Sequence, residues 1–472
     1  MNKSIKLNAI FNLIKQLTTY LYGFFIVFYI SRILGASQYG AYNFGTSVIS
    51  YFTSIAAFGI GTYAIREGAA LRKSKSEFKV FCGEMFSLSL LFTFIAYIGV
   101  ALILFIPFFN PYRNIILILS MPIIFQCIGV DWAIEAHEEY FYTMIRYIVT
   151  HLSSLVLMFI FIKSENDLLL FCLFSTLPNI LTNIINIFYL KKKGIKLSLS
   201  KLNFKKYFLP LLILWVNTLT ISIYVDSDKI LLTLMQDDTI TGIYSVAVSI
   251  YTMAKTTINS LISVSLPRLS SLENNNKEIL QKKILHSLLL VLIPCCVGLF
   301  FMSKTIINTF LGTSYLDGVN SLRILSITMF FSSFNFYCVY AILLPNKMEK
   351  KVFLSTIIGA ITNVVLNIIL IPLFSLNAAA FTTLISELII TIVCIYFIKK
   401  EILLIDKKLL FTLILSILII SITCICFIKL FNYSLMCLLL SVIVSFIIYS
   451  LLLYVMKDKI FMNIIKKVSK KQ

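Results

Sequence analysis

The feature that most constrains this chain is a series of apolar stretches, each long enough to cross a bilayer, that continues through almost its whole length. A transmembrane helix needs about 20 consecutive apolar residues, and lipid tolerates only segments whose backbone is hydrogen-bonded internally. Since 59% of the 472 residues are hydrophobic, we predict an all-α polytopic membrane protein with about fourteen transmembrane helices, or twelve if two weak spans fail to cross. The predicted spans are residues 8–31, 41–64, 80–107, 114–134, 143–162, 167–190, 208–228, 241–265, 284–303, 321–344, 352–374, 377–398, 408–428 and 434–456.

The Lys and Arg residues are distributed unequally among the gaps between these spans. Every second gap, together with both chain ends, holds 32 of the 41, and the remaining gaps hold seven. Cytoplasmic loops carry such an excess, so we predict cytoplasmic termini and an even number of spans. The net charge of +20 therefore reflects topology. It does not indicate nucleic-acid binding, because these cations lie in short loops and do not form one basic face.

The longest basic gap follows the sixth predicted span and divides the chain into two lobes. We predict an N-terminal six-helix lobe over residues 1–190, a cytoplasmic connector over 191–207, a C-terminal six-helix lobe over 208–400, and two extra helices with a basic tail over 401–472. A faint repeat at an offset of 202 residues supports two pseudo-symmetric halves, which are typical of secondary transporters. The residues that recur are Gly40, Tyr42 and Arg66 in the first half and Gly242, Tyr244 and Arg268 in the second.

Three basic residues are candidates for binding an anionic substrate. Lys15 and Lys255 lie well inside predicted spans, where a charge is costly and usually functional. Arg66 lies at the cytoplasmic edge of the second span. Since Lys and Arg bind phosphate through charge-assisted hydrogen bonds, a cavity lined by these residues would receive an anionic head group. The alternatives are that Lys15 extends its ammonium to the interface and that Arg66 only sets topology.

Oxygen-bearing side chains elsewhere are candidates for coupling transport to Na⁺ or H⁺. Carboxylate, amide and hydroxyl oxygens are hard ligands, and Asn363 and Asn367, four residues apart, share one helix face. The alternative is ordinary hydrogen bonding between helices, and Asp131 could instead cap a helix, pair with a cation or relay a proton. The candidates are Asp131, Asp226, Asp228, Asn363, Asn367, Thr382 and Glu387.

The sequence contains no motif for a cofactor or a catalytic centre. It has no phosphate-binding loop for ATP, its three His are scattered, and its ten Cys lack the spacing of a zinc site or a disulfide framework. We therefore predict a transporter that is not an enzyme and holds no cofactor or metal centre. A membrane enzyme such as a polysaccharide polymerase is disfavoured, because the outer gaps are too short for a catalytic loop.

Five motifs within the first 270 residues occur in the order found in one transporter family. They are Arg32-Ile33-Leu34-Gly35 with Gln38-Tyr39-Gly40-Ala41-Tyr42; Phe58-Gly59-Ile60 with Ile65-Arg66-Glu67; Asp131-Trp132 with Glu138-Glu139-Tyr140-Phe141; Asp228-Lys229-Ile230-Leu231-Leu232 with Gly242-Ile243-Tyr244-Ser245; and Pro267-Arg268-Leu269-Ser270. With these motifs the chain resembles the Wzx-like polysaccharide flippases of O-antigen and capsule repeat units. That family belongs to the MATE-like multidrug/oligosaccharidyl-lipid/polysaccharide exporter superfamily. Beyond residue 270 the likeness is one of topology.

The resemblance implies a specific function and location. It implies a flippase that moves an undecaprenyl-pyrophosphate-linked oligosaccharide from the cytoplasmic to the outer leaflet of the bacterial plasma (inner) membrane by ion-coupled alternating access. The partners that it implies are this substrate, the bilayer, and the polymerase and chain-length regulator of the same pathway. The alternative is a MATE-type antiporter of cationic drugs, whose cavity should be acidic.

The resemblance also bears on the candidate residues. Related lipid II flippases use basic residues of helices 1, 2 and 8 for the substrate and residues of helices 7, 11 and 12 for sodium. Lys15, Arg66 and Lys255 match the first set by helix. The second set is matched loosely, by Asp226 or Asp228, Asn363, Asn367 and Thr382. This chain offers a Glu, Glu387 of the twelfth span, rather than an Asp of helix 11.

Overall fold

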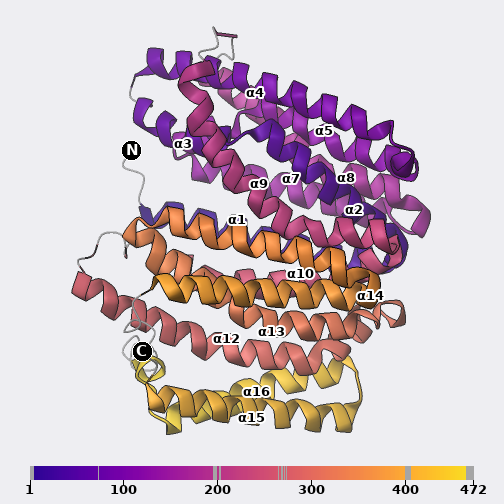
Figure 1. Ribbon diagram of the computed structural model, residues 1–472, viewed down its shortest axis with the longest axis vertical. Helices are drawn as coiled ribbons and strands as arrows, with labels where there is room; N and C mark the ends of the chain where they lie inside the picture. The colour runs from indigo at the N-terminus through magenta and orange to yellow at the C-terminus, as the bar shows by residue number, and fades with distance from the viewer. Residues whose placement is uncertain are drawn as a thin grey trace. The chain divides into compact units, whose positions relative to one another are not determined.

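A computed structural model describes residues 5–72, 74–194, 199–200, 204–263, 265–266, 269, 272, 274–398 and 406–463. All regular structure within these residues is helical, as Figure 1 shows. In chain order the elements of the first half are α1 (Ile5–Phe25), η1 (Ile26–Ile30), α2 (Ser31–Ala57), α3 (Ile60–Leu71), α4 (Lys75–Leu104), η2 (Pro107–Tyr112), α5 (Arg113–Gly129), α6 (Asp131–Ala136), α7 (Tyr140–Phe161), η3 (Glu165–Asp167), α8 (Leu168–Lys192) and α9 (Phe204–Met235). They are followed by α10 (Asp238–Ser263), α12 (Asn274–Phe310), η4 (Thr313–Tyr315), α13 (Gly318–Tyr337), η5 (Cys338–Leu343), η6 (Leu344–Asn346), α14 (Glu349–Phe397), α15 (Lys407–Phe431) and α16 (Leu435–Val455).

The predicted membrane spans coincide with helices of the described chain. Eleven helical segments are long and apolar enough to cross a bilayer. Two of them, at 14–71 and 349–397, each contain two predicted spans, and the predicted span 241–265 coincides with α10. All fourteen predicted spans are therefore helical, and the prediction of an all-α multi-pass membrane protein is confirmed.

The two longest segments are interrupted by residues with positive φ. Gly35 has a φ of 74° inside α2, a conformation that costs glycine little because it has no Cβ. Ser375 has a φ of 52° inside α14. Each break lies between two predicted spans, so the reversal of chain direction that we expected as a loop is made by one non-helical residue.

The chain divides into two compact units, Met1–Gly242 and Ile243–Gln472. Helix α9 packs against α2 within the first unit, although its residues follow the predicted connector. The predicted lobe boundaries at residues 190 and 208 stay a prediction. Residues 195–198 and 201–203 of the predicted connector, and Arg268 of the predicted repeat, lie outside the described residues.

The glycines of the predicted repeat meet inside the first unit. A Cβ placed on Gly40 of α2 would lie 1.7 Å from the carbonyl oxygen of Asp238, and one on Gly242 would lie 1.9 Å from that of Ala36. Each distance is far shorter than any real contact, so the backbone of α2 and the first turn of α10 approach closely only because both positions are glycine.

Apolar side chains hold each unit together. In the first unit, Phe44, Ile116 and Phe171 are fully buried in one cluster among α2, α5 and α8. In the second unit, α15 and α16 pack against α12 around Met302 and Cys424. Large exposed apolar residues such as Leu17, Phe94 and Phe446 are the side chains expected to face lipid, where a helix needs no polar surface.

Candidate functional site

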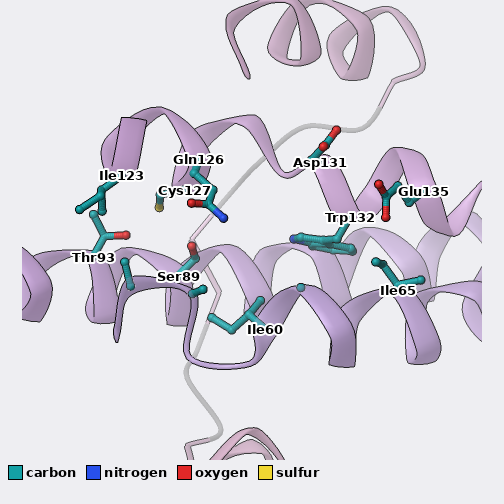
Figure 2. A pocket seen from close by; sticks show the side chains of 13 residues that line it. Ile60, Ile65, Ser89, Thr93, Ile123, Gln126, Cys127, Asp131, Trp132 and Glu135 are labelled. Atoms are coloured by element: carbon teal, nitrogen blue, oxygen red, sulfur yellow. The ribbon is translucent and has the colours of Figure 1, made fainter. Parts of the chain in front are cut away.

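A polar cavity of about 200 Å³ lies in the first unit, among α2, α3, α4, α5 and α6 (Figure 2). It exists because α5 ends at Val130, whose φ of 40° turns the chain into the short helix α6. Asp131 and Glu135 of α6 lie toward one end of the cavity in this view, and Thr93 of α4 lies toward the other. The remaining polar lining residues are Ser89 and Gln126.

Asp131 is engaged by a buried cation. Its Oδ1 accepts hydrogen bonds from Nη1 of Arg146 at 2.8 Å and from Nδ2 of Asn186 at 3.0 Å. Nη1 of Arg146 also donates to the side-chain oxygen of Asn186. The Arg146 side chain is only 2% exposed, and a buried charge needs such a partner. Of the roles considered for Asp131, pairing with a cation is the one that this geometry contains.

Lys15 lines a second cavity of the same unit. This cavity has a volume of about 170 Å³ and is bounded by Phe11, Lys15, Glu135, Tyr140 and Thr143. The Lys15 ammonium lies 5.5 Å from the centre of the Tyr147 ring, within the range of a cation–π interaction. Lys15 therefore faces a small polar space that also contains a carboxylate.

Glu135 belongs to both cavities and was not predicted from the sequence. It is half-buried, and burial is the main cause that raises its pKa, with the negative charge of Asp131 adding to the effect. The positive charges of Lys15 and Arg146 act in the opposite direction. The sequence feature that could have indicated Glu135 as a site residue is its position four residues after Asp131, which places both carboxylates on one face of a helix.

Arg66 has a different environment from Lys15. It lies on α3 with its side chain 66% exposed, and its Nε donates to the carboxylate of the adjacent Glu67 at 2.9 Å. The guanidinium also lies 5.5 Å from the centre of the Tyr63 ring. The structure thus gives Arg66 and Lys15 separate partners.

Lys255 is in the second unit, on α10. Its ammonium lies 4.7 Å from the centre of the Tyr251 ring, one helical turn earlier, and Glu387 of α14 attracts it electrostatically. Glu387 is 6% exposed, and Asn335 Nδ2 donates to its Oε2 at 2.7 Å. Thr391 Oγ1 in turn donates to the side-chain oxygen of Asn335 at 2.8 Å. A cation and an anion therefore share one buried polar network.

Three predicted ion-coupling residues meet within the second unit. Asn367 Nδ2 donates to Oδ1 of Asn363 at 3.2 Å, and Thr382 Oγ1 donates to Oδ1 of Asn367. All three are fully buried. The break at Ser375 folds the two halves of α14 together, so residues 15 positions apart come into contact. The sequence had indicated only the shared face of the two Asn residues.

Asp226 and Asp228 are in the first unit. Asp226 accepts hydrogen bonds from Ser47 at 3.3 Å and Ser50 at 2.7 Å, both on α2, and lies 3.7 Å from the Lys229 ammonium. Asp228 is buried. The predicted set therefore forms separate groups: Asp131 with Arg146, Asp226 with the α2 serines, and the residues of α14.

No cluster of three or more His, Cys, Asp or Glu side chains that could hold a metal ion occurs among the described residues.

Comparisons with known proteins decide the family. The sequence pattern of the family described as "Polysaccharide biosynthesis protein" matches residues 5–273, which is more than half of the chain. The chain belongs to this family. The resemblance identified from the motifs is thereby confirmed.

Two individual relatives are similar to this chain over different lengths. The chain is 24% identical over 410 residues to the "Putative O-antigen transporter" of Escherichia coli (strain K12), a match that covers 85% of this chain and 98% of that protein. It is 33% identical over 123 residues to the "Uncharacterized membrane protein MJ1068" of Methanocaldococcus jannaschii, covering 25% of this chain and 23% of that protein.

The fold is similar to that of solved transporters. An inward closed conformation of the lipid II flippase MurJ superposes with a TM-score of 0.73 at 16% identity, covering 97% of this chain and 99% of that chain. An inward-facing MATE-family multidrug transporter gives a TM-score of 0.59 at 14% identity, covering 82% of this chain and 94% of that one. The prediction of a transporter rather than an enzyme is confirmed.

Proposed function

We propose that this family member is a flippase for undecaprenyl-pyrophosphate-linked oligosaccharide repeat units of an O-antigen or a similar surface polysaccharide. It would act in the bacterial plasma membrane, with both termini cytoplasmic, and would move its substrate from the cytoplasmic to the outer leaflet. The observation that carries the proposal is the match to 98% of a protein named as an O-antigen transporter. The chain also superposes on a lipid II flippase with a TM-score of 0.73, so its fold is compatible with this function.

We propose that Lys15, Arg66 and Lys255 bind the pyrophosphate. Lys255 has the strongest support, because its half-buried ammonium lies within an apolar helix and is attracted by the buried carboxylate of Glu387. A pyrophosphate carries more charge than a carboxylate and accepts several hydrogen bonds, so it would compete with Glu387 for Lys255. Lys15 has intermediate support, since it is half-buried beside a cavity. Arg66 has the least, since it is exposed and paired with Glu67.

We also propose that the polar groups within each unit couple transport to an ion gradient by alternating access. Asn363, Asn367 and Thr382 bring amide and hydroxyl oxygens together at a buried point, the kind of ligand set that suits a hard cation. Asp226 and Asp228 of α9 and Asp131 of α6 are the carboxylates that could bind an ion or a proton in the first unit.

Complementation tests the proposal. A strain that lacks repeat-unit export should regain surface polysaccharide when it expresses the wild-type chain. It should stay deficient with Lys15→Ala and Lys255→Ala combined. Lys429→Ala, at the last turn of α15, is the matched control and should complement fully. Full surface polysaccharide from the double variant would contradict the binding assignment, and failure of the wild type in every O-antigen host tested would contradict the flippase function.

A drug antiporter of the MATE type is the second candidate, because the fold also superposes on MATE transporters. A pocket for cationic drugs should be acidic, whereas the half-buried Lys255 of the second unit opposes a cationic ligand. Susceptibility to cationic dyes in an overexpressing strain distinguishes the two functions. Increased resistance, without export of polysaccharide, would favour the antiporter.

A further inference from the structure

Glu135 is the one residue that lines both of the cavities described above, which lie in the first unit. The larger cavity extends from Glu135 past Asp131 and Gln126 toward Thr93 (Figure 2). The smaller cavity lies between Glu135 and Lys15. A carboxylate at this junction faces a proposed phosphate-binding lysine on one side and a space large enough for water on the other.

The charges around Glu135 come from three helices. Lys15 is on α1, Asp131 is on α6 with Glu135, and Arg146 and Tyr140 are on α7. Arg146 and Asp131 bind each other at 2.8 Å, so their charges largely cancel. The α3 residues that line the larger cavity, Ile60, Gly61 and Ile65, carry no charge. Among the described side chains, Lys15 is therefore the cation that remains to compensate Glu135.

Glu135 differs from Asp131 in its hydrogen bonding. Asp131 Oδ1 accepts hydrogen bonds from both Arg146 and Asn186, which hold its carboxylate in place. The part of the chain that the structure describes supplies no hydrogen bond or ion pair within 4 Å to the Glu135 carboxylate. Its ionised form depends on electrostatic attraction across the small cavity, and this attraction is the quantity that a bound anion would change.

We propose that Glu135 takes up a proton when Lys15 binds the phosphate of the substrate, so that proton binding and substrate binding are linked in the first unit. The inference rests on the proposed function, because it assumes that Lys15 receives a phosphate. The proton comes from bulk water and converts the Glu135 carboxylate to a carboxylic acid, and no other bond changes. Lys15 is thereby released from the carboxylate and its whole charge is directed to the phosphate.

Electrostatics supports the direction of this linkage. Burial already raises the pKa of Glu135, and Lys15 is a cause that lowers it. A phosphate on Lys15 removes that stabilisation of the carboxylate and adds a nearby negative charge, so the pKa rises further. At any pH between the two values, binding draws in a proton. Conversely, protonation of Glu135 strengthens phosphate binding, as thermodynamic linkage requires.

Isothermal titration calorimetry of the purified full chain with inorganic pyrophosphate tests the linkage. Titrations near pH 7 in buffers of different ionisation enthalpy give the number of protons taken up on binding. We expect the wild type to take up more protons than Glu135→Gln does. Comparing the two chains removes the contribution of the protons that pyrophosphate itself exchanges. Glu135→Gln should still bind, with an affinity that depends less on pH, and Glu135→Asp should restore part of the uptake.

Two controls separate a specific role from a structural one. Glu138→Gln alters a carboxylate three residues away that pairs with Arg72 and lines neither cavity, and it should take up protons as the wild type does. Lys15→Ala should lose both the uptake and most of the binding. His137 lines neither cavity, and its Nδ1 lies 2.8 Å from the Ala133 carbonyl oxygen.

The outcomes distinguish this inference from the proposed function. Equal proton uptake by the wild type and Glu135→Gln would overturn the role of Glu135 and leave the flippase proposal intact. Absence of pyrophosphate binding, or binding that Lys15→Ala does not weaken, would overturn the role of Lys15 and the inference with it. The complementation assay would still decide the flippase function independently.

Discussion

The pair of Arg146 and Asp131 allows a quantitative prediction about stability. Replacing Asp131 by Asn keeps the shape of the side chain but removes the negative charge beside an arginine that is 2% exposed. At 2.8 Å the Coulomb attraction is about 6 kcal/mol for an effective dielectric constant of 20. Much of this is offset by desolvation, and removal of one partner of a buried pair typically costs about 3–5 kcal/mol.

The solvent exposure of Asp131 lowers the expected free-energy cost of this substitution. Its side chain is 39% exposed, so solvent screens part of the interaction, and Asn186 still accepts a hydrogen bond from Arg146. We therefore expect Asp131→Asn to destabilise the first unit by about 2–3 kcal/mol. For a unit of this size, that corresponds to a decrease in Tm of about 5–10 °C.

A thiol-reactive fluorophore measures this unfolding directly. Cys82, Cys127 and Cys172 are buried thiols of the first unit and react only when it opens, whereas Cys295 and Cys426 are exposed and give a constant baseline. The double variant Asp131→Asn with Arg146→Met should be less destabilised than the sum of the two single variants, because it leaves no buried charge unpaired.

An exposed ion pair on the same unit supplies the control for this prediction. Arg72 and Glu138 are similarly close, at 2.7 Å, but their side chains are 38% and 45% exposed. Glu138→Gln should therefore cost less than about 1 kcal/mol. If Asp131→Asn lowers Tm no more than Glu138→Gln does, or if the double-variant cycle is additive, the buried pair does not have the energetic role that we assign to it.

Three further predictions follow from other contacts. Gly40→Ala should abolish folding or lower Tm by more than about 10 °C, since the added Cβ would overlap a backbone carbonyl. Thermal melts in detergent measure this change, and an unchanged Tm would contradict the close approach. Lys255→Met should destabilise the second unit by about 2–4 kcal/mol because it leaves Glu387 uncompensated, and adding Glu387→Gln should recover part of the loss in the same melts. Thr382→Val should remove the hydrogen bond to Asn367. If these residues form the ion site, the increase in Tm that Na⁺ produces should fall several-fold, whereas an unchanged increase would exclude the site.

The sequence predicted those parts of the fold that depend on local pattern. A run of about 20 apolar residues needs a lipid environment regardless of its neighbours, so every predicted span proved to be helical. Lys15 and Lys255 could also be recognised from local pattern, because each places a single charge within an apolar run. The reversals at Gly35 and Ser375 were expected as loops, since one residue of positive φ leaves little trace in hydropathy.

The sequence could not predict the partners of the charged groups. Arg146 was assigned to topology, yet it is buried by contacts with Asp131 and Asn186, which are 15 and 40 residues away. Glu135 precedes Glu138 and Glu139 and reads as part of a solvated acidic loop. Its role depends on how α6 packs beside α1 and α7, and tertiary packing of this kind is not recorded in the spacing of residues along one helix.

The close approach of Gly40 and Gly242 limits how this chain can change. Most contacts in a protein can be repaired, because an enlarged side chain on one helix is accommodated by a smaller one opposite. Here the group opposite each glycine is backbone, and backbone cannot be made smaller. A side chain at either position therefore has no compensating substitution at the other, so neither glycine can vary alone while α2 and the start of α10 keep this close approach.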